Sequence, residues 1–213
     1  MAEPDMLNGD IGALLALKEK WAARRDVERC ELCARVLSDE HPHLVDVAAR
    51  RIVCSCEPCA MLFDNASGAR YSRIPRDAEM LDDVMDDTAW NSLAIPINLA
   101  FFFFSSAAGR MMAMYPSPGG ATEAELSAEA WDGVAHSSPL LQQLRRDVEA
   151  LLVNRLRTPA ECYIAPIDRC YELTGLIRTH WAGFSGGDAV WREVDAFFDR
   201  LRGHARRAGA PYA

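Results

Sequence analysis

The stretch "RCELCARVLSDEHPHLVDVAARRIVCSCEPCAMLF", residues 29–63, holds five of the seven cysteines and two of the five histidines of this 213-residue chain. Cysteines at this density indicate either disulfides or a bound metal ion. The opening residues, "MAEPDMLNGDIGALLALKEKW", lack the basic start, long apolar run and small-residue cleavage site of a signal peptide. We therefore expect a cytoplasmic protein, in which clustered cysteines favour metal or redox chemistry over disulfides.

Two C-x2-C pairs carry the metal prediction: Cys30 with Cys33, and Cys56 with Cys59. A two-residue gap lets one tight turn present two thiolates to the same ion, and the longer gap lets the second pair approach across a hairpin. A tetrahedral zinc ion needs four such ligands at about 2.3 Å. These four cysteines are the predicted ligands. Four thiolates leave no position for water, so the predicted site is structural and not catalytic.

The sequence between the pairs predicts a treble-clef or zinc-ribbon-like module over residues 29–64. "HLVDV" (43–47) and "RRIVC" (50–54) are strand-like runs joined by two alanines. "EPCAMLF" (57–63) has a proline suited to the first turn of a helix. A knuckle, a hairpin and a helix that carries the last ligands follow one another in this order.

Three further side chains leave alternatives open. If the second strand persists, Cys54 and Cys56 point to the same face, so Cys54 replaces Cys56 as ligand, adds a reactive thiol beside the metal, or is a small buried residue. His41 and His43 also share a strand face and serve either the metal or the packing of a turn. Zinc is the preferred ion, although a rubredoxin-like iron centre would use the same four sulfurs.

The rest of the chain predicts an α+β fold: the N-terminal helix and metal module, then a mostly antiparallel sheet with flanking helices. Residues 1–28 contain an amphipathic helix over 10–27, and residues 64–78 are a turn-rich bridge. The α+β domain is expected over residues 78–203. Its predicted strands come in pairs, at residues 98–106 with 109–117 and at residues 148–156 with 161–168.

Capping signals predict the helices of this domain. Thr122 with Glu125 forms a capping box for a helix that runs to about residue 136, and a short helix is expected over residues 139–144. Apolar spacing predicts a helix over residues 168–181. Ser185 with Asp188 is expected to cap a final helix, and the tail after residue 203 is expected to fray.

The charge and several local motifs narrow the function classes. A net charge of −8 disfavours nucleic-acid binding, and no apolar run reaches the ~18 residues of a membrane-spanning helix. "GFSGG" (183–187) matches the G-x-S-x-G motif of hydrolases, but a helix is predicted before it where that motif requires a strand. We therefore expect a protein partner, and the oligomeric state stays open.

Other polar residues carry weaker expectations. Cys162 and Cys170 are expected to be buried as apolar residues, with a second metal or redox pair as the alternative. The stretch "YPSPGGATE" (115–123) is an ordinary connection or an anion site at a helix N-terminus. A polar cleft would form only if the sheet brought together Arg110, Arg155, Arg169, Arg178 and His180.

Taken together, "CELC", "HPHLVD", "RRIVCSCEPCAMLF", "AIPINLAFFFFSSAAGRMMAMYPSPGGATE", "VEALLVNR" and "YIAPIDRCYELTGLIRTHWAGFSGGDAVW" make a distinctive combination. Over roughly residues 29–202 the chain resembles an uncharacterised actinobacterial family that is catalogued as a domain of unknown function. The resemblance implies a gene neighbourhood of nickel–iron uptake hydrogenases and their maturation factors, and it implies no catalytic residue.

Three functions are compatible with this setting. The first is a non-catalytic zinc protein that assists the assembly, maturation or partner docking of a hydrogenase. The second is a rubredoxin-like iron protein that passes electrons to or from that enzyme. The third is an enzyme with a small-molecule pocket in the α+β domain.

Overall fold

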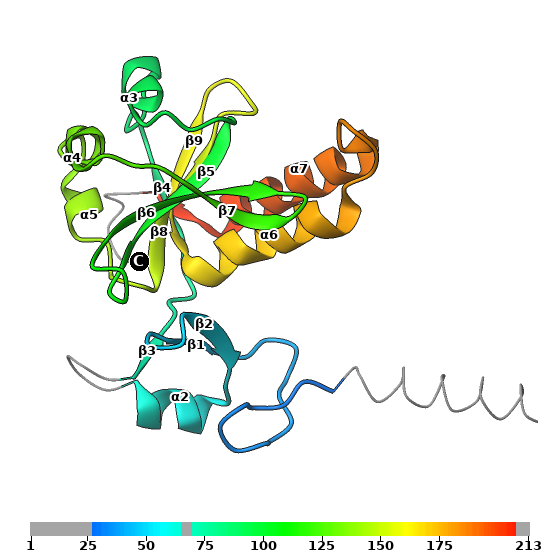
Figure 1. Ribbon diagram of the computed structural model, residues 1–213. Coiled ribbons are helices and arrows are strands. Elements are labelled where there is room, and N and C mark those ends of the chain that lie inside the picture. Colours follow the sequence, from blue (N-terminus) through cyan, green and yellow to red (C-terminus); the bar gives the residue numbers. More distant parts are fainter. Residues whose placement is uncertain (1–26, 65–69, 208–213) are drawn as a thin grey trace, which may run out of the picture.

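The computed structural model describes residues 27–64 and 70–207 (Figure 1). A small region at the bottom of Figure 1 carries the cysteine-rich stretch, and a larger region lies above it. We call residues 27–74 the cysteine module and residues 78–207 the body. The helix predicted over residues 10–27 lies, except for its last residue, outside the described residues.

The cysteine module contains a three-stranded antiparallel sheet of order β2-β1-β3 and one helix. β1 and β2 form the predicted hairpin, in which His43 lies opposite Cys54. β3 occupies part of the stretch predicted as a bridge. A small core forms between this sheet and the helix from Leu44, Val53 and Ala60. The elements are β1 (His43–Asp46), β2 (Arg51–Cys54), α2 (Glu57–Phe63) and β3 (Tyr71–Arg73).

The body is built on a seven-stranded sheet of order β10-β4-β9-β8-β5-β6-β7. All neighbouring strands are antiparallel except β10 and β4, so the mostly antiparallel α+β prediction is confirmed. The strands are β4 (Glu79–Leu81), β5 (Leu99–Ser105), β6 (Arg110–Ser117), β7 (Gly120–Ala124), β8 (Glu149–Asn154), β9 (Glu161–Pro166) and β10 (Arg206–Arg207).

Helices cover both faces of this sheet, which gives three layers (Figure 1). Alternate residues of a strand point to opposite faces, so β5 sends Phe101 into one core and Phe102 into the other. The first core lies beneath α6 (Ile167–His180) and α7 (Gly187–His204). The second lies beneath α3 (Asp87–Ser92), α4 (Ala128–Ala135) and α5 (Pro139–Gln142).

The first of the two capping predictions for the body is wrong. The Thr122–Glu125 capping box does not open a helix, because Thr122 pairs with Tyr115 in the β6–β7 hairpin and its hydroxyl donates to Ser117 Oγ at 3.0 Å. α4 begins later and is capped by Ser127. Within the described part of the tail, residues 204–207 do not fray as predicted, since α7 continues to His204 and β10 then pairs with β4.

The module packs directly against the body. Val45 of β1 and Ile74, which follows β3, are buried in the same core as α6 and α7. His43 adds a polar tie, because its Nδ1 lies 2.8 Å from Oδ2 of Asp168 at the start of α6. Within residues 27–64 and 70–207, no helix has the length and apolarity needed to cross a membrane.

Candidate metal centre

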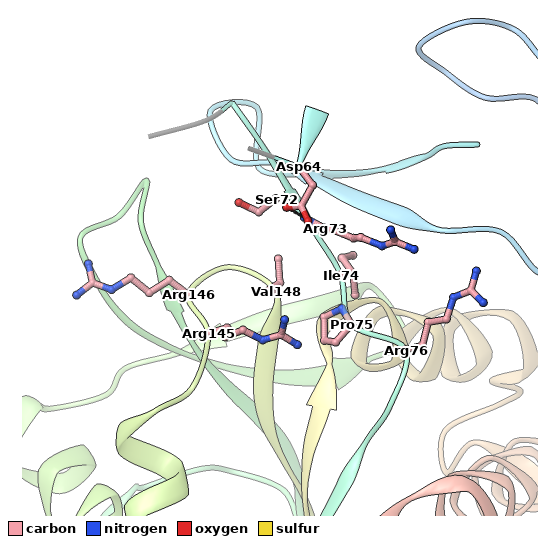
Figure 2. A pocket seen from close by; sticks show the side chains of 9 residues that line it. All are labelled: Asp64, Ser72, Arg73, Ile74, Pro75, Arg76, Arg145, Arg146 and Val148. Atoms are coloured by element: carbon pink, nitrogen blue, oxygen red, sulfur yellow. Dashed lines mark hydrogen bonds between the residues drawn. The ribbon is translucent and has the colours of Figure 1, made fainter. Parts of the chain in front are cut away.

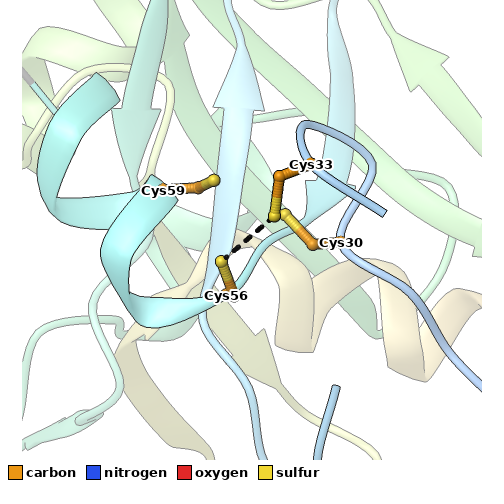
Figure 3. A group of neighbouring side chains, drawn as sticks. All are labelled: Cys30, Cys33, Cys56 and Cys59. Carbon is orange, nitrogen blue, oxygen red and sulfur yellow. Dashed lines mark hydrogen bonds between the residues drawn. The ribbon is translucent and has the colours of Figure 1, made fainter. Parts of the chain in front are cut away.

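The structure brings together the four predicted cysteines (Figure 3). Their sulfur atoms all lie within 4.8 Å of one another, and Sγ of Cys33 is 3.6 Å from Sγ of Cys56. Cys30, Cys56 and Cys59 are buried, whereas Cys33 is exposed. The cluster therefore sits just beneath the surface of the module, with one thiol at its edge.

A tight knuckle positions the first pair. The amide of Ala34 donates to the carbonyl of Cys30 at 2.8 Å, and the amide of Cys30 donates to the carbonyl of Arg35 at 2.8 Å. Ala34 accepts a left-handed conformation, with φ of 61°, to close this turn. The turn folds Cys33 back beside Cys30, as the two-residue spacing predicts.

The start of α2 positions the second pair. Cys56 is the N-cap residue of this helix, and Cys59 lies in its first turn after the proline. A backbone bond of 2.9 Å from the amide of Glu31 to the carbonyl of Cys54 holds the knuckle against the end of β2. The two pairs therefore face each other although 23 positions separate Cys33 from Cys56.

The electrostatics of the cluster fit a cation. Burial raises the pKa of Cys30, but backbone hydrogen bonds from Cys56, Leu32 and Cys33 and a hydrogen bond with the Cys33 thiol outweigh it and lower that pKa to about 6. Burial, followed by hydrogen bonds with the other three thiols, raises the pKa of Cys59 to about 12. The Cys30 thiol therefore loses its proton first, and its negative charge disfavours a second thiolate at Cys59. A bound divalent ion would remove this repulsion between thiolates.

Cys54, His41 and His43 form a second group beside the four cysteines. A ring nitrogen of each histidine and the sulfur of Cys54 lie within 4.8 Å of one another. The four-sulfur cluster contains Cys56 and not Cys54, so the geometry favours Cys56 as the third of the four predicted ligands. Asp168, the partner of His43, lies 125 positions away and had no local signal in the sequence.

The remaining cysteines do not form a second pair. Cys162 is buried in the core beneath α3, α4 and α5, whereas Cys170 is buried in the core beneath α6 and α7. The sheet therefore separates them. Burial raises the pKa of both thiols, which behave as neutral apolar groups.

Neither the hydrolase motif nor the predicted arginine cleft forms a site. Ser185 is exposed, and helix α6 precedes it instead of a strand. It does not cap α7 either, because Gly186 is the N-cap residue with φ of 90° and no side chain caps the helix. Three of the predicted cleft residues pair instead with separate carboxylates: Arg110 with Glu123, Arg155 with Asp87, and Arg169 with Glu172.

A cavity of about 500 Å³ lies where the module meets the body (Figure 2). Its lining includes Arg73, Arg76, Arg145 and Arg146, whose guanidinium groups do not converge on one point in Figure 2. Carboxylates already pair with three of them: Glu57 lies 2.7 Å from Arg73 and 3.9 Å from Arg76, and Glu149 lies 2.7 Å from Arg145. The cavity is a weaker candidate site than the cysteine cluster.

The comparisons with known proteins bear on the family alone. A family model described as a family of unknown function (DUF5947) matches residues 29–205, which include the cysteine cluster and nearly all of the body. No curated protein and no solved structure matches the chain.

Proposed function

The chain belongs to this family of unknown function, and from that premise we propose that it is a non-catalytic zinc-binding accessory protein. In this proposal the four-cysteine centre closes the cysteine module, and the module docks a protein partner. The division into a module and a separately folded α+β domain is part of the proposal.

The observation that carries the zinc proposal is the convergence of four sulfurs on one point (Figure 3). A tetrahedron with Zn–S bonds of about 2.3 Å has edges of about 3.8 Å. The Cys33–Cys56 separation of 3.6 Å is close to such an edge, and a spread within 4.8 Å needs only small side-chain adjustments. The sulfur-only donor set supports zinc or iron over magnesium or calcium. When bound, zinc would supply folding free energy and no open coordination position.

Metal analysis of the purified full chain tests this proposal. We expect zinc, a colourless sample, and the loss of one equivalent of zinc in the Cys30→Ser variant. Cys170→Ser, which changes a buried cysteine of the body, is the matched control and should keep all its metal. An iron thiolate centre would colour the sample, would contradict zinc and would support the electron-transfer alternative.

The surface of α2 supports the docking role. The side chains of Met61 and Leu62 are 68 % and 64 % exposed on a helix whose first turn carries Cys59. Large apolar side chains exposed side by side are typical of protein interaction sites. The four-cysteine centre would fix the orientation of this helix. The resemblance of the motifs to a hydrogenase-associated family supports a hydrogenase subunit or maturation factor as the partner.

Co-purification from cells that express the hydrogenase tests the partner. We expect hydrogenase subunits or maturation factors to be recovered with the wild-type chain and to be lost with Met61→Glu combined with Leu62→Glu. Leu156→Glu, at a residue of the body that is 42 % exposed, is the matched control. Equal recovery of these proteins by all three chains would contradict docking through α2.

A cytoplasmic location completes the proposal. All seven cysteines are free thiols in the structure, and the proposed centre needs four of them reduced. A reducing compartment keeps them so. Fractionation of the source cells checks this location, and recovery of the chain outside the cytoplasm would contradict it.

A further inference from the structure

We propose that His41, His43 and Cys54 form a second metal site, distinct from the four-cysteine centre, for a divalent transition ion such as zinc. The site would have three protein ligands and one open coordination position. It goes beyond the proposed structural role of the four cysteines, since those leave no position open.

The first argument is an unpaired nitrogen of His41. This side chain is only 6 % exposed, and its Nε2 is buried without a hydrogen-bond partner in the described part of the chain. Its Nδ1 lies 2.9 Å from the carbonyl oxygen of Ser38, which can only accept, so Nδ1 carries the proton. Nε2 is then a buried lone pair. A buried polar atom without a partner is costly, and a metal ion would satisfy it.

The second argument is the orientation of His43. Its Nδ1 donates to Oδ2 of Asp168 at 2.8 Å, which leaves the lone pair on Nε2. Histidines that bind metal donate their other ring nitrogen to a carboxylate or a carbonyl in this manner. Both acceptor types occur here: the carboxylate of Asp168 for His43 and the carbonyl of Ser38 for His41.

The third argument is that the backbone brings the three donors together. His43 and Cys54 are directly opposite partners in the β1–β2 hairpin, so their side chains share one face. The rings of His41 and His43 have centroids 4.8 Å apart and meet edge to face at 81°. The carbonyl of Pro42, between the histidines, accepts a hydrogen bond from the amide of Ser55 at 2.9 Å, which holds the segment of the two histidines beside the end of β2.

The distances leave a small adjustment. One ring nitrogen of each histidine and the sulfur of Cys54 lie within 4.8 Å of one another. Donor atoms around one tetrahedral zinc ion are about 3.3–3.8 Å apart, so rotation of the two imidazole rings and of the Cys54 side chain has to bring the three donors together. The carboxylates of Glu28, at 3.5 Å from Nδ1 of His41, and of Asp168 add negative charge that favours a cation here.

The open position is accessible. The side chain of His43 is 31 % exposed, and both histidines line a cavity of about 510 Å³ between the module and the body. Water or a small ligand can therefore reach an ion held by the two imidazoles. The donor set of two nitrogens and one sulfur suits zinc, cobalt and nickel better than magnesium or calcium.

Metal titration of the full chain tests the proposal, with Zn²⁺ for stoichiometry and Cd²⁺ for the ligand set. We expect two equivalents of zinc in the wild type. We also expect two ¹¹³Cd resonances, one for four thiolates and one, further upfield, for a site with a single thiolate. His41→Ala and Cys54→Ser should each bind one equivalent and lose only the upfield resonance. His136→Ala, at an exposed histidine of the body, should keep both.

The wild-type cadmium spectrum decides the matter even if a variant fails to fold. A single ¹¹³Cd resonance with one equivalent of zinc would overturn the second site. Two equivalents in His41→Ala and in Cys54→Ser would overturn it as well. A failure of the four-cysteine centre is recognised separately, because the resonance of the four-thiolate site would then be missing.

Discussion

The cysteine module and the body are stabilised in different ways, although one chain forms both. The module buries few apolar side chains around its own centre: Leu44, Val53 and Ala60 form one small cluster, and three of the cysteines form another. The body buries apolar side chains on both faces of a seven-stranded sheet. Small units cannot bury enough surface to fold on apolar contacts alone, and metal ligands commonly supply the difference. In our proposal, a metal ion held by the four thiols stabilises the module in place of the larger core that its size does not allow.

Removal of the proposed metal should give the largest difference in stability between the module and the body. Chelation, or Cys30→Ser, should cost the module on the order of 10 kcal/mol of binding free energy and unfold it, because that binding energy is also its folding energy. Amide hydrogen exchange should accelerate across residues 29–64 while the strands of the body stay protected. Slow exchange in the module after chelation would contradict stabilisation of the module by a metal. Equal acceleration in both regions would contradict the independent stability of the body.

A substitution that creates a cavity in the core of the body should destabilise the body and leave the metal content unchanged. Phe102 is fully buried and packs against Trp131 with ring centroids 5.8 Å apart. Phe102→Ala should lower the free energy of unfolding of the body by about 3–5 kcal/mol, since it removes a ring from a close-packed core. Denaturant unfolding followed by tryptophan fluorescence measures the loss. The zinc content should stay unchanged, and its loss would show that the module depends on this core.

An ion pair between α7 and β9 should have an intermediate effect. Nε of Arg202 donates to Oε1 of Glu161 at 2.9 Å, and Glu161 is only 8 % exposed. Arg202→Met should destabilise the body by about 1–3 kcal/mol, because it leaves a buried carboxylate with fewer partners. Thermal unfolding measures this loss. Arg157→Met, at an exposed pair with Asp195, is the control and should cost no more than about 1 kcal/mol.

Helix capping should give the smallest effect. Ser127 caps α4 by accepting the amide of Ala130 at 3.1 Å, so Ser127→Ala should cost about 1 kcal/mol. Ser185→Ala should change the stability by no more than about 0.5 kcal/mol, because its side chain caps nothing. Chemical denaturation of the two variants side by side checks the difference. A larger loss of stability for Ser185→Ala would support the helix cap that the sequence predicted.

Local patterns predicted the elements whose signals lie within a few residues. The strand-like runs around His43 and Val53 and the apolar run around Phe101 all became strands. The capping box at Thr122 failed because hairpin pairing with β6 outweighed a local helix signal. β3, β4 and β10 are only two or three residues long, so each owes its formation to its neighbours in the sheet.

The four cysteines were predictable as a set because the two C-x2-C spacings can be recognised in the sequence alone. The contacts of the second group were not. The distance of 2.8 Å between His43 and Asp168 depends on how the module lies against α6. The buried, unpaired nitrogen of His41 depends on the packing of the turn around it. Tertiary contacts of this kind leave no spacing rule in the chain.

The burial of Val45 and Ile74 among the side chains of the body would extend the influence of the proposed metal centre beyond the module. If the module unfolded, these two residues would leave the core and expose a hydrophobic patch beneath α6 and α7. Such a patch attracts other molecules, so a demetallated chain should self-associate as its concentration rises. If the proposed zinc centre forms, the supply of zinc would control the solubility of the chain as well as its fold, and light scattering before and after chelation measures this effect.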